Sequence, residues 1–150
     1  MTDPHTLIGR VLPAFSATAE RGRLQLFAEV LGETDRTYFD LDAARASGYP
    51  DLPVPPTFFF SLELGRPNAH GVLAELGVDL RQVLHGEQAF SYQALAFAGQ
   101  SLDFAPRFSD YYEKKNGALR FLVRRTEVSR GGEPVATLSN TLVIRQLELV

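Results

Sequence analysis

The sequence predicts an α+β domain in which a curved antiparallel sheet wraps around one apolar helix. Three observations predict it. The first half of the chain holds short segments with helical periodicity, broken by Gly and Pro. One of them, Phe58 to Leu64, is apolar on nearly every side, which is typical of a buried helix. From Glu87 onward, apolar residues alternate with polar or small ones, the period of a β-strand.

Composition restricts the class of protein. At 150 residues and 45% hydrophobic, the chain is long enough for one packed domain, residues 1–150, and short for two. A net charge of −3 does not favour nucleic-acid binding. The chain lacks cysteine and has three scattered histidines, so we expect no disulfide and no metal site. The polar N-terminus and the absence of a long apolar run predict a cytoplasmic protein that does not enter a membrane.

The helical half contains recognisable starts and stops. Leu24, Phe27 and Leu31 share one helix face, and that helix should stop near Gly32. Asp40 is a suitable N-cap for a second helix through residues 43–46, which Gly48 would end. Prolines fix the entry to the apolar helix at Phe58, and a further short turn of helix is expected from Gly71 to Leu76.

The strand half is punctuated by two turn signals. Lys115-Asn116-Gly117 is a strong hairpin signal, because Asn and Gly tolerate the positive φ of a type I′ turn. The second turn is Arg130-Gly131-Gly132-Glu133. These turns predict about four long antiparallel strands after one short N-terminal strand. Such a sheet needs a cover for its concave face, and the apolar helix provides one. This arrangement is the hot-dog architecture.

Several motifs resemble the hot-dog acyl-thioester dehydratases of the MaoC-like group. The closest resemblance is to the N-terminal-type domain, which also occurs as an accessory subunit of heterodimeric (3R)-hydroxyacyl thioester dehydratases. The matching segments extend over nearly the whole chain; they are Gly9-Arg10, Leu12-Pro13, Phe27-Ala28-Glu29, Gly32 to Asp35, Tyr38, Asp40, Ala43-Ala44, Gly48 to Asp51, Pro53 to Phe58, Leu84 to Gln88, Ala98-Gly99 and Tyr111 to Lys115.

The resemblance implies reversible hydration of a 2-enoyl thioester, carried on coenzyme A or acyl carrier protein and needing no other cofactor. Active members place an Asp and a His five residues apart on one loop. In this chain those two positions are Glu33 and Tyr38. The backbone amide that polarises the thioester carbonyl belongs to Thr57, so the segment Pro56 to Phe58 is implied in substrate binding. His85 is implied in the acyl tunnel.

The exchange of His for Tyr weakens the expected proton transfer. A phenol has a pKa of about 10, whereas an imidazole has a pKa of about 6.5. The amide of Thr57 would survive the change from glycine, because the donor is backbone. The resemblance therefore predicts a loop that holds a ligand but relays protons poorly.

Plainer roles stay open for each residue. Glu33 can be a solvated acid, Tyr38 a packing residue, and His85 either a structural residue or a replacement base. Arg124, Arg125, Lys114 and Lys115 are expected to be solvated strand-end charges, with contact to the phosphates of a carrier as the alternative.

Three functions follow in order of preference. The first is an acyl-thioester-binding subunit that is weakly catalytic or inactive alone and pairs with a catalytic hot-dog partner or a second copy. The second is an active homodimeric enoyl-CoA hydratase that uses Glu33, with water or His85 in place of the imidazole. The third is a binding module without a reaction. Pairing is also expected because a single hot-dog layer leaves an edge strand exposed.

Overall fold

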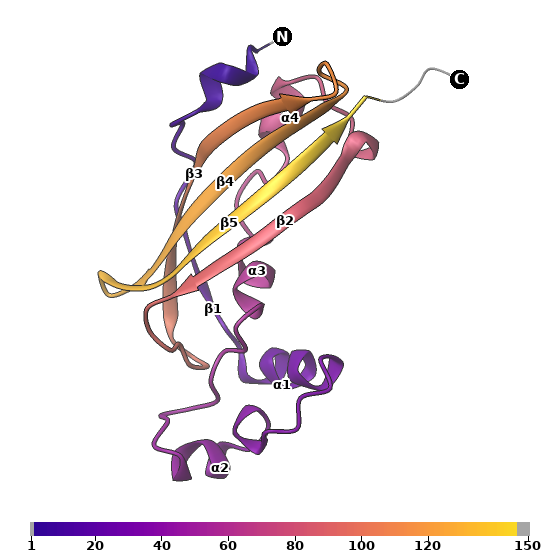
Figure 1. Cartoon of the computed structure of the whole chain (residues 1–150). Coiled ribbons are helices and arrows are strands. Elements are labelled where there is room, and N and C mark those ends of the chain that lie inside the picture. Colours follow the sequence, from indigo (N-terminus) through magenta and orange to yellow (C-terminus); the bar gives the residue numbers. More distant parts are fainter. Residues whose placement is uncertain (1, 147–150) are drawn as a thin grey trace.

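The computed structural model describes residues 2–146 and contains one five-stranded antiparallel sheet (Figure 1). The strands lie in the order β1-β3-β4-β5-β2. Their bounds are Phe15–Thr18 (β1), Val83–Tyr92 (β2), Ser101–Lys114 (β3), Leu119–Arg130 (β4) and Glu133–Arg145 (β5). The short strand β1 forms one edge and the longer β2 forms the other. The predicted fold class, α+β with a hot-dog sheet, is confirmed.

Within residues 2–146, four α-helices and three 3-10 turns precede or connect the strands. The helices are Arg21–Val30 (α1), Leu41–Ala46 (α2), Phe58–Glu63 (α3) and Gly71–Glu75 (α4); the 3-10 turns are Pro4–Leu7 (η1), Arg36–Tyr38 (η2) and Leu80–Gln82 (η3). Figure 1 shows α3 against the sheet, with α1 and α2 gathered beyond one end of it. None of the helices in residues 2–146 is long and apolar enough to cross a membrane.

The two residues that were predicted to begin and end the second helix lie at the ends of α2. Asp40 Oδ1 accepts hydrogen bonds from the N–H groups of Asp42 and Ala43 at 2.9 and 3.3 Å, so it caps α2 as expected. Gly48 follows α2 with a φ of +87°, a conformation that favours glycine. Helix α3 ends one residue earlier than predicted, at Glu63, and Leu64 is 51% exposed.

Both hairpins form where the turn signals stand. Lys115, Asn116 and Gly117 have positive φ values between β3 and β4. Gly131 and Gly132, at φ +56° and +86°, connect β4 to β5. Strand β2 begins at Val83, four residues before the alternation becomes visible in the sequence, because a bulge between His85 and Glu87 interrupts the period of two.

The interior consists of two apolar clusters. Phe58, Phe59 and Leu62 of α3 pack with the inward side chains of β3, β4 and β5 in the larger cluster. In the second cluster, Leu73 of α4 and Leu76, which directly follows α4, pack with the other end of the same strands. Between the two clusters, paired positions across β4, β5 and β2 carry polar side chains: Arg124 pairs with Asn140, and Asn140 pairs with Gln88. The sheet face under the helices is therefore apolar at both ends and polar in the middle.

Candidate functional site

The loop between α1 and α2 contains Glu33 and Tyr38, which stand at the positions of the Asp and His of active members. Gly32, at φ +71°, ends α1, and the N–H of Glu33 donates to the carbonyl of Ala28 at 3.0 Å. Oε1 of Glu33 then accepts hydrogen bonds from the N–H groups of Thr34 and Asp35 at 2.8 and 2.9 Å. The side chain is exposed. The Glu33 carboxylate thus forms hydrogen bonds within its own loop.

Tyr38 lies at the end of η2, in the same loop and half-buried. Burial raises the pKa of its phenol above the ordinary 10.0, and the nearby carboxylates of Glu33 and Asp35 raise it further. Because a raised pKa keeps a phenol neutral, Tyr38 is a poorer proton donor near pH 7 than an ordinary tyrosine. The loop therefore holds a carboxylate and a neutral phenol.

The start of α3 borders an apolar cavity. Tyr92, on β2, donates its hydroxyl to the carbonyl of Pro56 at 2.7 Å, which fixes the segment entering the helix. Thr57 is exposed at the N-cap position. The cavity beside it measures about 430 Å³ and is lined by Val54, Pro56, Phe59, Tyr92, Gln93, Ala94, Leu95 and Ala96. Of the predicted binding residues, Pro56 lines this space directly and Thr57 follows it in the chain.

Phe58 points elsewhere. Its side chain is 3% exposed, its ring meets the ring of Phe27 edge to face at 5.1 Å, and the guanidinium of Arg23 lies over it at 5.2 Å. The structure places Phe58 in the core that joins α1 to α3, while the next residue, Phe59, reaches the cavity.

His85 occupies a different place. It lies on β2, with its ring edge to face against Phe60 at 5.5 Å and its Nδ1 atom 3.5 Å from Nδ2 of Asn140. It lines a cavity of about 220 Å³ whose lining residues differ from those of the cavity beside Pro56. The structure thus groups Glu33 with Tyr38 and Pro56 with Thr57, and it sets His85 apart.

The interpretation of Arg124 as a solvated strand-end charge is wrong. Arg124 is 3% exposed, and its Nε donates to Oε1 of Glu63, which is 1% exposed, at 3.0 Å. Thr126 donates a hydroxyl hydrogen bond to the same oxygen. Two signals in the sequence point to this group. Arg124 occupies an inward position between Leu122 and Thr126, and Glu63 is the one charged residue in a largely apolar helix.

Comparisons with known proteins agree with the fold. The family model described as "FAS1-like, dehydratase domain region" matches residues 6–138. A UPF0336 protein of Streptomyces coelicolor is 37% identical over 149 residues, covering 95% of both chains. The C-terminally truncated HadBC (3R-hydroxyacyl-ACP dehydratase) complex of Mycobacterium tuberculosis contains a chain with a TM-score of 0.74 and 21% identity, covering 95% of this chain and 98% of that one.

A further solved structure, a MaoC-like dehydratase, has a TM-score of 0.80 and 18% identity; the match covers 96% of this chain and 44% of that chain. This chain therefore corresponds to less than half of that longer protein. The family model accounts for most of the residues, and the structural matches show the same curved sheet around a helix. The chain belongs to the family described as "FAS1-like, dehydratase domain region", and its fold is that of the MaoC-like hot-dog dehydratases.

Proposed function

We propose that this chain is an acyl-thioester-binding subunit of a (3R)-3-hydroxyacyl thioester dehydratase, and that it transfers protons weakly or not at all. One observation carries the proposal: the two positions that would move protons hold a carboxylate engaged with its own loop and a phenol whose pKa is raised. A general acid or base works best with a pKa near the working pH. A neutral phenol of this kind is a poor replacement for an imidazole.

The ligand-holding part of the site supports the same proposal. An apolar cavity of about 430 Å³ beside Pro56 and Phe59 suits a segment of an acyl chain. The hydrogen bond from Tyr92 to Pro56 fixes the residue that precedes Thr57, which supports a role for the Thr57 amide in binding a thioester beside this cavity. Ligand binding then depends on α3 and β2, whereas proton transfer, which is weakened, would depend on the α1–α2 loop.

A partner surface is available at the edge of the sheet. Strand β2 is a long edge strand, and Leu84 and Tyr92 on it are 50% and 45% exposed. An exposed, partly apolar edge is stabilised when another strand pairs with it. Pairing of β2 with the same strand of a second hot-dog subunit, identical or catalytic, extends the sheet. The likeness to a chain of the HadBC complex supports a partner of this kind.

The decisive experiment measures hydration of a short trans-2-enoyl thioester, on coenzyme A and on acyl carrier protein, by the purified chain alone. We expect little turnover alone, together with saturable binding of the thioester. Robust turnover that disappears in Glu33→Gln but persists in Glu29→Gln would overturn the proposal in favour of an active hydratase. Glu29 is the matched control because it is an exposed glutamate on the last turn of α1.

Two further arms separate the alternatives. Loss of activity in His85→Ala, with Glu33→Gln unaffected, would assign the base to the second cavity. Co-purification with a hot-dog subunit that carries an intact Asp and His five residues apart, with activity only in the complex, would support the heteromeric form.

Another pair of variants tests association through the β2 edge. Leu84→Glu, on β2, is expected to weaken association in analytical ultracentrifugation. Val11→Glu, at an exposed position beside β3 on the opposite side of the sheet, is not expected to weaken it.

A further inference from the structure

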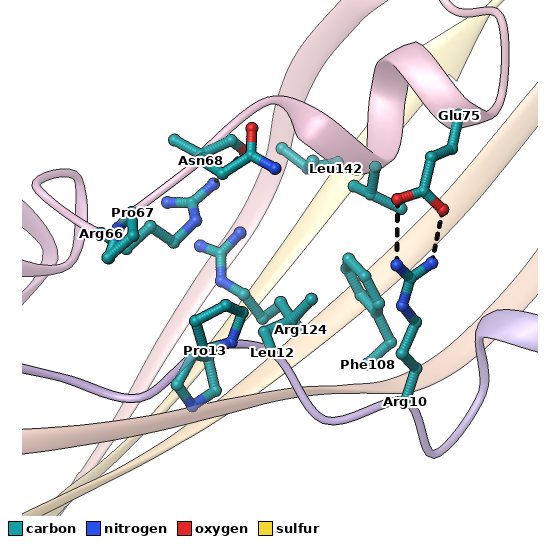
Figure 2. Close-up of a pocket in the computed structure, with 13 residues that line it drawn as sticks. Arg10, Leu12, Pro13, Arg66, Pro67, Asn68, Glu75, Phe108, Arg124 and Leu142 are labelled. Carbon is teal, nitrogen blue, oxygen red and sulfur yellow. Dashed lines mark hydrogen bonds and ion pairs between the residues drawn. The ribbon is translucent and has the colours of Figure 1, made fainter.

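A further cavity, which shares Arg66, Ala69, Arg124 and Leu142 with the cavity that His85 lines, contains charged side chains that the proposed function does not use. It measures about 150 Å³ and lies between the N-terminal segment, the loop before α4 and the sheet (Figure 2). The guanidinium groups of Arg66 and Arg124 lie at one end of it, and Arg10 and Glu75 lie at the other. Leu12, Val72 and Phe108 are among the apolar residues that line it.

The end at Arg10 is electrically balanced. Both terminal nitrogens of Arg10 donate to the carboxylate of Glu75, at 2.6 and 2.9 Å. This two-point pair uses the fork of the guanidinium and both carboxylate oxygens. It connects the N-terminal segment to α4 and has no spare charge to offer a ligand.

The end at Arg66 is not balanced. The carboxylate of Glu63 accepts from Nε of Arg124 at 3.0 Å, whereas Arg66 donates to two backbone carbonyls, those of Glu63 and Ala69, at 3.4 and 3.0 Å. Among residues 2–146, no ion pair is recorded for Arg66. Two guanidinium groups and one carboxylate leave one positive charge in excess.

Burial lowers the pKa of Arg66 to about 10; the positive charge of Arg124 lowers it further, and the carboxylate of Glu63 raises it in part. Figure 2 shows the two guanidinium groups next to one another at the cavity. In residues 2–146, the recorded hydrogen bonds of Arg124 involve its Nε atom, so its terminal nitrogens remain as donors for a ligand. A single negative charge at this point would relieve the repulsion between the arginines and occupy those donors.

We propose that this cavity binds a short-chain aliphatic monocarboxylate. Its carboxylate lies between Arg66 and Arg124, and its chain lies against Leu12, Val72 and Phe108. The planar fork of arginine matches a carboxylate in geometry as well as charge. One excess positive charge matches one negative charge. A cavity of about 150 Å³ holds roughly five water-sized groups, which fits a carboxylate with a few carbons.

Butyrate is the probe. The purified chain is titrated with butyrate by isothermal calorimetry at constant ionic strength, and n-butanol, n-butylamine and inorganic phosphate are titrated in parallel. We expect saturable binding of butyrate with a stoichiometry of one, and binding of the other three weaker by roughly tenfold or more. Equal binding of butanol would reduce the site to an apolar cavity, and equal binding of phosphate would make it a general oxyanion site. Either result, or no binding of butyrate, would overturn the proposal.

Variants separate the two halves of the site. Arg66→Gln removes the charge and leaves a shorter polar side chain; it should weaken butyrate binding by roughly tenfold. Arg81→Gln is the matched control, since Arg81 is exposed and pairs with Asp79 outside the cavity.

Val72→Phe fills the space for the chain without touching either arginine, so it tests the site even if Arg66→Gln folds poorly. Loss of butyrate binding in Val72→Phe, with a folded circular dichroism spectrum, supports the proposal. Undiminished binding in either variant contradicts it. None of these changes touches Glu33, Tyr38 or Thr57, so the thioester-binding proposal stands or fails separately.

Discussion

Glu63 and Arg124 form an ion pair at 3.0 Å between α3 and β4, with 1% and 3% of their side chains exposed. The pair lies where the polar row of the sheet separates the two apolar clusters. Removing both charges from water is expensive, so such a pair contributes little net stability. Its effect is on position, because Oε1 of the buried carboxylate accepts its hydrogen bonds only where Arg124 and Thr126 reach it.

Breaking this pair on one side should be costly. We expect Glu63→Ala to lower the free energy of unfolding by about 3–5 kcal/mol, since Arg124 is then left buried without its partner. The double variant Glu63→Leu with Arg124→Met should lose much less, because neither charge remains. Urea unfolding followed by circular dichroism measures both, as the chain has no tryptophan. A double variant as unstable as Glu63→Ala would show that the ion pair makes a large net contribution to stability, contrary to this expectation.

The sequence alone predicts the elements that depend on a few neighbouring residues. Asp40 caps α2 and the Lys115-Asn116-Gly117 turn forms, because caps and tight turns depend on a few adjacent residues. Alternation along β4 also assigns Arg124 to the inward face. What it cannot supply is the partner, since Glu63 is 61 residues away and meets Arg124 only through the packing of α3 on the sheet.

The candidate site was predictable to the same extent. Glu33 and Tyr38 share a loop, so their proximity follows from the sequence, but the engagement of Glu33 with its own backbone depends on how that loop closes. The separation of His85 from Pro56 depends on where α3 crosses the sheet. The start of β2 was missed because the bulge at Gly86 interrupts the period of two.

That bulge yields a second prediction. A Cβ atom at Gly86 would lie 2.5 Å from Cγ2 of Val143, on the neighbouring strand β5. Gly86→Ala should therefore lower the free energy of unfolding by about 1–3 kcal/mol, the usual cost of crowding a packed contact. In Val143→Ala the obstructing methyl is absent, so adding Gly86→Ala to that background should cost clearly less. Additive effects of the two substitutions in urea unfolding would contradict the contact.

Acid should weaken the attachment of α1 to the segment before α3. Arg21 donates Nε and Nη2 hydrogen bonds to Asp51 at 3.1 and 2.7 Å, and these hold the pKa of Asp51 below its ordinary value of 3.8, with help from the N–H of Leu52. A carboxyl with a lowered folded pKa adds stability that is fully present above the unfolded pKa and is lost as the pH falls through the folded one.

We therefore expect Asp51→Asn to lower the Tm at neutral pH, and we expect the difference from the parent protein to narrow below about pH 4. Differential scanning calorimetry over a pH series measures the effect. Asp42→Asn is the control, because Asp42 is exposed and no ion pair is recorded for it in residues 2–146. A Tm difference that stays constant down to the lowest pH would show that the effect of Asp51 on stability does not come from its charge.

Tyr38 provides the most direct test of the missing proton transfer. Burial and the carboxylates of Glu33 and Asp35 raise its pKa above 10.0, so the folded protein should hold this phenol neutral to higher pH than the unfolded chain does. The difference in ultraviolet absorbance between the parent protein and Tyr38→Phe, followed through an alkaline titration, isolates this one phenol. We expect the phenolate to form above pH 10 in the folded state and near the ordinary value of about pH 10 in urea. Stability should fall as the pH rises past the unfolded pKa, and less steeply in Tyr38→Phe. A phenolate signal near neutral pH would instead identify an activated tyrosine, and the α1–α2 loop would then be able to relay protons after all.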